Sequence, residues 1–308
     1  MSDTVLTIPE PIGPAHTEGA TAKDRRPPKM RGREDRSPLA SAALHGTLVF
    51  ATFCALFPVL WILLSSFKPA NRIQTSEITL IDNPTLENYR AVLFDTPFPT
   101  WFLNSVVVAA FTMVIGVTMS ATCGYALSRF NFAGKRGLMW VFLITQMFPV
   151  AILIVPIYTI MADLGLINTK ASLIIAYCTV AVPFCAWMLR GYFDTIPKEL
   201  DEAAALDGLG PFGTFYRVIL PLARPGLAVT AFYTFLTAWG EVAYAIAFMQ
   251  TRDKLTLGAG LQQFVPQFNP QWHLLTAGSV LILIPAAIVF FFAQKHLVAG
   301  LTAGGTKG

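Results

Sequence analysis

Long runs without a charged side chain divide this sequence and limit what it can fold into. Five stretches contain no Asp, Glu, Lys or Arg, and a sixth contains a single acid, Glu241. Each run approaches the roughly 20 helical residues that cross the hydrocarbon core of a bilayer. We therefore predict six membrane-spanning helices, near residues 42–64, 101–127, 138–160, 171–189, 226–249 and 274–293.

The composition excludes several other classes of protein. Hydrophobic residues make up 54% of the 308 residues and charged residues 13%, about half the charged share of an ordinary soluble domain. A disordered chain, a nucleic-acid-binding domain and a disulfide-built secreted scaffold are excluded. The alternative for the six runs is burial as core helices of a large soluble protein, which the scarcity of charges between them disfavours. The predicted fold class is all-α integral membrane.

Basic residues indicate which way the chain crosses the membrane. Sixteen of the 22 Lys and Arg residues fall in segments on the same side as the N-terminus, and six on the other side. Because connections rich in Lys and Arg stay in the cytoplasm, both termini are expected there. The net charge of +4 is then a signal of topology and does not indicate an acidic partner.

The N-terminal segment, residues 1–40, differs from the rest of the chain. It is rich in proline and mixed charges and has few large apolar side chains, so it cannot bury enough surface to fold. We predict a disordered cytoplasmic tail. A secretory signal is excluded because the first apolar run is too long and starts too late.

No cofactor or metal site is predicted. The four cysteines lie inside apolar runs without a CxxC pair, and the four histidines do not cluster. Neither GxGxxG nor GxxxxGK[ST] occurs, so we expect no ATP hydrolysis by this chain itself.

The connection over residues 190–225 is long for a linker and carries a helix signature. Pro197 suits a first turn, where its missing N–H is harmless. Acids that favour a helix N-terminus follow it: Glu199, Asp201 and Glu202. Gly208 can end the helix as a left-handed cap, and a second short amphipathic piece is expected over residues 212–219.

One face of this predicted helix contains small residues. Leu200, Ala203 and Ala204 are spaced to share one face, and alanines allow another protein to approach the backbone closely. Two interpretations stay open: a helix that slots into a partner's cleft, and an ordinary amphipathic surface helix.

Several motifs give the sequence a family resemblance. Glu202-Ala203-Ala204, Gly208 and Leu220-Pro221 stand at the spacing of the EAA loop of ABC importer permeases, with Val218 where isoleucine is usual. Segments similar to the carbohydrate branch of that family are Arg190-Gly191-Tyr192-Phe193, Ile196-Pro197, Tyr125-Ala126-Leu127-Ser128-Arg129 and Gly134-Lys135. Residues 300–308 resemble the C-terminus of the smaller permease subunit of maltose/maltodextrin importers. The resemblance covers residues 39–308.

The resemblance implies a type I ABC importer permease fold in a domain over residues 41–308, in the inner membrane of a bacterium or archaeon. It implies no enzymatic activity and four kinds of partner: a second homologous permease, two ATP-binding subunits, an external sugar-binding protein and the sugar. The EAA helix would couple ATPase closure to alternating access. The expected coupling residues are Glu202, Ala203, Ala204, Gly208, Leu200 and Asp207.

The glycine-rich C-terminal tail, residues 294–308, has two interpretations. It is a frayed chain end, or, as the resemblance implies, it enters the ATPase dimer interface, where glycine permits close approach. The expected contact residues are Thr302, Gly304 and Gly305.

Glu241 is expected to face the bundle interior or a wet cavity, because a charge at the membrane centre is costly. Two roles stay open: lining a sugar path, and an interhelical hydrogen bond that holds the fifth span. The candidate path residues are Glu241, Tyr244, Trp239, Gln146 and Asn104.

A different class of function also fits six spans, namely a self-sufficient secondary carrier or channel. Such a carrier would often show paired intramembrane charges and an inverted repeat. The predicted spans contain one acid, no basic partner for it and no obvious repeat.

Overall fold

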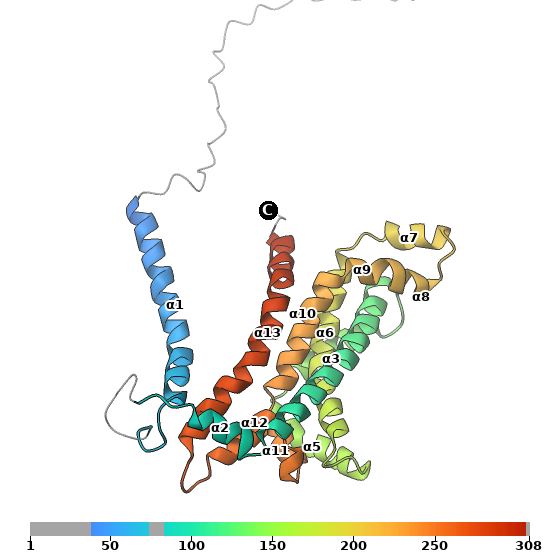
Figure 1. The fold of residues 1–308 in the computed structure, drawn as a ribbon. Helices are drawn as coiled ribbons and strands as arrows, with labels where there is room; N and C mark the ends of the chain where they lie inside the picture. Colours follow the sequence, from blue (N-terminus) through green and yellow to red (C-terminus); the bar gives the residue numbers. More distant parts are fainter. Residues whose placement is uncertain (1–37, 74–82, 306–308) are drawn as a thin grey trace, which may run out of the picture. The chain divides into compact units, whose positions relative to one another are not determined.

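The computed structural model describes residues 38–73 and 83–305. Two units meet after Ala55, and helix α1 (Pro38–Ser66) belongs to both; the second unit, which begins at Leu56, contains all other described elements. The predicted tail, residues 1–40, lies outside the described residues except for its last three, which begin α1. Every regular element among the described residues is a helix (Figure 1).

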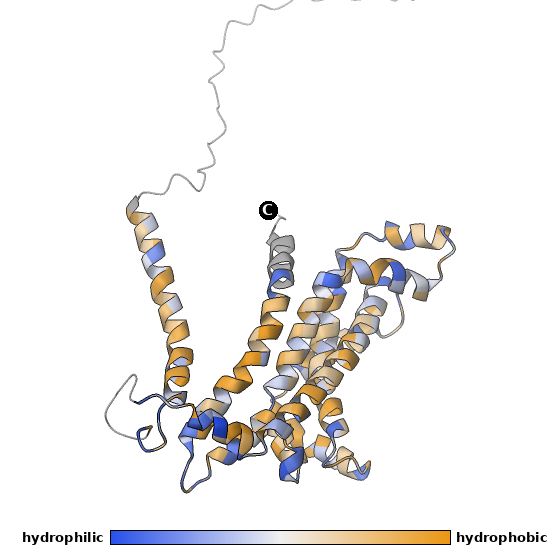
Figure 2. Ribbon diagram, viewed as in Figure 1, coloured by the Kyte–Doolittle hydropathy of each residue, from blue (hydrophilic) through white to orange (hydrophobic). Residues whose placement is uncertain are grey.

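Among the described residues, four helices are long and apolar enough to cross a membrane. They are α1, α3 (Phe98–Arg129), α6 (Lys170–Asp194) and α13 (Trp272–Gly305). Their hydrophobic residues form continuous stretches, while polar residues gather at the ends of the bundle (Figure 2). These helices agree with the predicted spans one, two, four and six.

The third predicted span is not one straight helix. It consists of α4 (Lys135–Thr145) and α5 (Val150–Asp163), which are bent by 109° relative to each other. Pro149 lies at the break with an extended ψ of 130°. Proline has no N–H for the helix ladder and disfavours helical backbone in the residue before it, which explains the interruption.

The fifth predicted span, residues 226–249, is wrong as a single helix. Helix α10 (Arg224–Trp239) ends at Gly240, and a separate short helix, α11 (Ala243–Phe248), follows. The loop segment Pro211–Leu222 enters α10 at a bend of 82°. With each bent pair counted as one span, the described residues contain up to six spans.

The core forms where α3 packs along α6 and α10 packs against both helices and α13. Large fully buried side chains such as Trp101, Tyr177 and Tyr244 fill it. Gly124 of α3 allows close contact with α6, since an added Cβ would lie 3.0 Å from the carbonyl oxygen of Ala186. Small residues serve this purpose in membrane helix pairs.

Short elements close the end of the bundle away from α7 (Glu199–Leu206), as Figure 1 shows. They include α2 (Glu87–Phe94), η2 (Arg252–Lys254), α12 (Leu257–Leu261) and η3 (Gln262–Phe264). The Trp101 indole donates to the carbonyl of Arg252 at 2.7 Å, and the Ser105 hydroxyl accepts from the Leu257 amide at 2.7 Å. These bonds satisfy loop backbone that the bundle buries.

Candidate functional site

The connection between α6 and α10 is built from short helices at one end of the bundle (Figure 1). They are α7, α8 (Pro211–Thr214), the π-helix η1 (Phe215–Ile219) and α9 (Leu220–Leu222). Both helical pieces predicted for this connection are therefore present. Phe215 and Ile219 are buried and anchor the segment to a second hydrophobic cluster that includes Phe193.

Helix α7 has a glycine cap at its C-terminal end, as predicted. Gly208 adopts a φ of +82°, where a Cβ is unfavourable. The Leu209 amide donates to the Ala204 carbonyl at 2.9 Å, and the Gly208 amide donates to the Ala205 carbonyl at 3.0 Å. This pair of bonds is a Schellman motif, which fixes where α7 stops and in which direction the chain leaves it.

The inward face of α7 differs from the prediction. Ala204 is buried, with 4% of its surface exposed, and Asp201 points toward α3. Leu200 and Ala203, predicted to share a face with Ala204, are exposed. Asp201 lies on the same side of α7 as Ala204 and forms an ion pair with Arg129 of α3.

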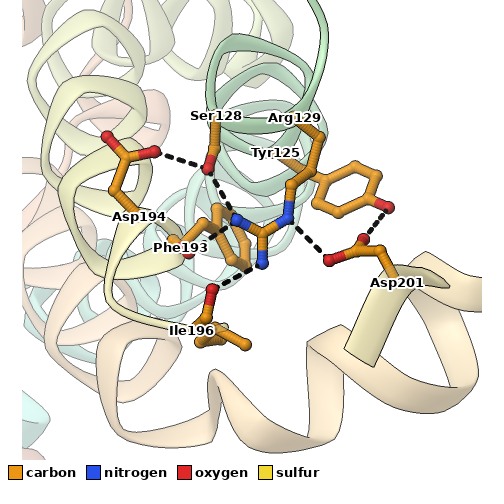
Figure 3. Close-up of polar contacts among 7 residues, drawn as sticks. All are labelled: Tyr125, Ser128, Arg129, Phe193, Asp194, Ile196 and Asp201. Carbon is orange, nitrogen blue, oxygen red and sulfur yellow. Dashed lines mark hydrogen bonds and ion pairs between the residues drawn. The ribbon is translucent and has the colours of Figure 1, made fainter. Parts of the chain in front are cut away.

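Arg129, the last residue of α3, makes that ion pair. Its Nε lies 2.9 Å from Oδ2 of Asp201, and the Tyr125 hydroxyl donates to Oδ1 of the same carboxylate at 2.9 Å (Figure 3). The side chain of Arg129 is only 6% exposed and that of Asp201 20%. Charged side chains that are withdrawn from water to this degree need a partner of opposite charge, and Arg129 and Asp201 are each other's partner.

The same guanidinium also satisfies the end of α6. Nη1 donates to the Phe193 carbonyl at 3.1 Å, and Nη2 donates to the Ile196 carbonyl at 3.0 Å (Figure 3). Both carbonyls lie where a helix end leaves acceptors without intrahelical donors. A single side chain thus holds together the C-terminal ends of α3 and α6 and the first turn of α7.

Asp194 adds a second polar link between α3 and α6. It accepts a hydrogen bond from the Ser128 hydroxyl at 2.6 Å and pairs with Arg190 at 3.4 Å. The contacts of Asp194 therefore join the ends of α3 and α6, to which the Arg129–Asp201 pair links α7.

The outward face of α7 and the start of α8 present apolar and acidic groups to the surroundings. Leu206 is 90% exposed and Phe212 is 84% exposed. Glu202 is exposed, and its carboxylate has no hydrogen bond or ion pair with any described residue. The predicted coupling residues Ala203, Asp207 and Gly208 are also exposed here. This face therefore carries two large exposed apolar side chains together with an exposed acid.

The sequence did not predict the contacts among Tyr125, Arg129 and Asp201. Arg129 and Asp201 are 72 positions apart, so sequence spacing alone cannot pair them. Two local features could have suggested an ion pair here: an Arg directly after an apolar run, and an acid in the first turn of a predicted helix.

Glu241 makes a local contact and also interacts with the Tyr177 hydroxyl of α6, so its roles in a path or in an interhelical bond stay predictions. Its carboxylate accepts the Tyr244 amide at 2.9 Å and the Ala245 amide at 3.3 Å. The acid therefore caps the first turn of α11, the element that the prediction did not separate from α10.

The other path candidates make separate hydrogen bonds. Asn104 donates to the carbonyls of Asp253 and Leu255, Trp239 to that of Ile282, and Gln146 to that of Val180. Tyr244 is fully buried, and its hydroxyl has no hydrogen-bond partner among the described residues. Trp239 lines an apolar cavity of about 320 Å³ beside α13.

The backbone at the C-terminus is helical as far as Gly305, at the end of α13. Thr302, Gly304 and Gly305 thus lie on a helix, and the last three residues lie outside the described residues. The predicted contact of this tail with an ATPase stays a prediction.

Known proteins resemble this chain over most of its length. It is 35% identical to the maltodextrin transport system permease protein MalD of Streptococcus pneumoniae, covering 85% of this chain and 93% of that protein. It is 38% identical to the maltose/maltodextrin transport system permease protein MalG of Vibrio vulnificus, covering 82% and 91%. The arabinooligosaccharides transport system permease protein AraQ of Halalkalibacterium halodurans is 34% identical, over 88% and 98%.

A solved structure shares the fold. A chain of a bacterial ABC transporter involved in the import of the acidic polysaccharide alginate superposes with a TM-score of 0.72 at 25% identity, covering 83% of this chain and 95% of that chain. The family of binding-protein-dependent transport system inner membrane components matches residues 116–303, which contain α6, α7 and α10. The relatives and the family match favour a permease subunit over a self-sufficient carrier: this chain belongs to the family of binding-protein-dependent transport system inner membrane components, the permease subunits of ABC importers.

Proposed function

We propose that this chain forms half of the translocation path of an oligosaccharide importer and passes conformational change between ATP-binding subunits and the membrane spans through α7. One observation carries the proposal: α7 exposes an apolar and acidic face outward while Arg129 fixes its inward face to the ends of α3 and α6. A helix held in this way moves together with the spans when a partner displaces it.

The proposed partners are a second homologous permease, two ATP-binding subunits that contact α7, and an external binding protein. ATP hydrolysis belongs to the separate subunits. The side that carries α7 is proposed to be cytoplasmic, together with both termini, because Lys and Arg concentrate in the segments on that side.

The proposed substrate class is a maltodextrin-like oligosaccharide. The support is similarity to relatives named for maltodextrin, maltose and arabinooligosaccharide transport. Uptake of labelled maltodextrins and of arabinooligosaccharides by vesicles that contain the assembled transporter tests this assignment. If the vesicles take up neither kind of sugar, the assignment is contradicted.

Cross-linking tests the proposed contact of α7. The four cysteines Cys54, Cys123, Cys178 and Cys185 are first replaced, and a single cysteine is placed at Ala203 on the exposed face of α7. We expect a short bifunctional reagent to join Ala203→Cys to an ATP-binding subunit in the assembled transporter.

The matched control is Gln250→Cys, an exposed position at the other end of the bundle. It should form no cross-link to the ATP-binding subunit. Equal cross-linking from the two positions, or none from Ala203→Cys in a complex that hydrolyses ATP, would contradict the proposal.

A further inference from the structure

A second cavity lies beside the α3–α4 connection and has a strongly basic lining. Its volume is about 440 Å³, and its basic lining residues are Lys135, Arg136 and Arg190. No acidic residue lines it. Arg190 stands four residues before the end of α6, so the cavity lies at the same end of the spans as α7.

The charges in this cavity are only partly compensated. Arg190 pairs with Asp194 at 3.4 Å, and the Lys135 amine donates to the Phe130 carbonyl at 3.1 Å. The Arg136 guanidinium has no hydrogen bond or ion pair with any described residue. Three cations against one nearby carboxylate leave an excess of positive charge.

The backbone adds to this field. Helix α4 is 11 residues long and begins in the cavity lining, with Gly134 as its N-cap. Its first turn contains no acid, and no side chain caps it. The uncapped first turn, whose residues Lys135 and Arg136 line the cavity, adds positive potential there, and such an arrangement favours an anion.

The remaining walls are apolar and continue along the membrane-spanning part of α4. Phe132, Met139, Trp140 and Leu143 complete the lining. Trp140 is 57% exposed, and no residue of α4 is buried by the rest of the chain. An aromatic residue beside cations at the end of a span is typical of the membrane interface.

We propose that this cavity binds the headgroup of an anionic phospholipid. The cations and the start of α4 hold the phosphate, and the acyl chains lie along Met139, Trp140 and Leu143. Basic pockets between spans suit such headgroups. A free phosphate ion carries the same kind of charge but makes no favourable contact with the apolar wall. The apolar wall therefore favours the phospholipid.

Fluorescence of Trp140 provides the test, with the full chain in phosphatidylcholine bilayers that contain either brominated phosphatidylglycerol or brominated phosphatidylcholine. Bromine quenches nearby indoles, and subtraction of the Trp140→Phe signal isolates Trp140 from the five other tryptophans. We expect phosphatidylglycerol to quench Trp140 with a several-fold preference over phosphatidylcholine.

Charge removal should abolish that preference. A basic residue near an anionic membrane surface contributes enough attraction for up to about a fivefold change in binding, so Arg136→Gln should remove part of the several-fold preference. Lys135→Gln combined with Arg136→Gln should bring it close to one. Arg217→Gln is the matched control, because Arg217 is exposed on η1 and does not line the cavity.

Two measurements on the unmodified chain keep the test independent of how the variants fold. The preference should fall as sodium chloride is raised, since salt screens exposed charges, and it should survive millimolar inorganic phosphate at matched ionic strength. The proposal is overturned by equal quenching by the two lipids, by an unchanged preference in the double variant, or by displacement with inorganic phosphate.

Discussion

Arg129 is the residue on which the position of α7 depends. Its guanidinium makes one ion pair with Asp201 and two hydrogen bonds to carbonyls at the end of α6. A buried charge that loses its partner is destabilising by several kcal/mol, so the contacts of this side chain are worth more together than an exposed ion pair is.

Asp201→Asn and Arg129→Gln should each lower the free energy of unfolding by about 1–3 kcal/mol, because each leaves a largely buried polar group without its charged partner. The double variant should lose less than the sum, with a coupling of about 0.5–3 kcal/mol. Titration of the purified chain with a denaturing detergent measures these values. Glu199→Gln, an exposed acid on the same helix, serves as the control; simple additivity would contradict a direct interaction.

At this scale the sequence predicted the cap and missed the ion pair. The acids after Pro197 and the glycine at position 208 are local signals, and α7 ends in the left-handed cap they indicate. The partner of Asp201 depends on how α3 and α7 pack in space. That packing leaves no periodic trace in the sequence, so the rotation of α7 could not be predicted.

At the scale of the elements, the sequence predicted the positions of the spans but not the breaks within them. Hydrophobicity located the spans because a bilayer requires about 20 apolar residues, and this signal does not report whether the backbone continues through the run. Pro149 separates α4 from α5, and a carboxylate at Glu241 separates α10 from α11. A single acid in an apolar run indicates a special position but does not reveal that the acid caps a new helix.

Glu241→Ala should destabilise the chain by about 0.5–2 kcal/mol, the usual cost of a lost helix cap, since the amides of Tyr244 and Ala245 lose their acceptor. The stability of Glu241→Gln should fall between that of Glu241→Ala and that of the unmodified chain, because the glutamine amide oxygen still accepts a hydrogen bond. Substrate affinity of the assembled transporter should not change. An Ala variant with unchanged stability and weakened affinity would assign Glu241 to the translocation path.

At the scale of the whole molecule, the surface of α7 and α8 presents two large exposed apolar side chains. Leu206 and Phe212 stand out of the end that carries α7, and neither is needed for packing within the chain. An aromatic and an aliphatic group of this exposure are expected to be covered in the assembled importer.

The combined variant Leu206→Ser and Phe212→Ser should therefore fold normally and lose ATP-binding subunits on affinity purification, by about tenfold or more if each side chain contributes about 1 kcal/mol or more to binding. Phe268→Ser is the matched control, since Phe268 is 82% exposed and lies in the connection between η3 and α13. Equal recovery of ATP-binding subunits with both variants would show that this surface is not the docking site.

Transport per ATP by Gly208 variants tests the central claim most directly. The φ of +82° costs a side chain other than Asn or Asp about 1–2 kcal/mol, and an added Cβ would meet nothing within 4 Å. In vesicles with the assembled transporter, Gly208→Leu should therefore insert and assemble but take up about tenfold less oligosaccharide per ATP hydrolysed. Gly208→Asn, which tolerates this backbone, should stay close to the unmodified chain. Normal uptake per ATP by Gly208→Leu would contradict a coupling role for α7.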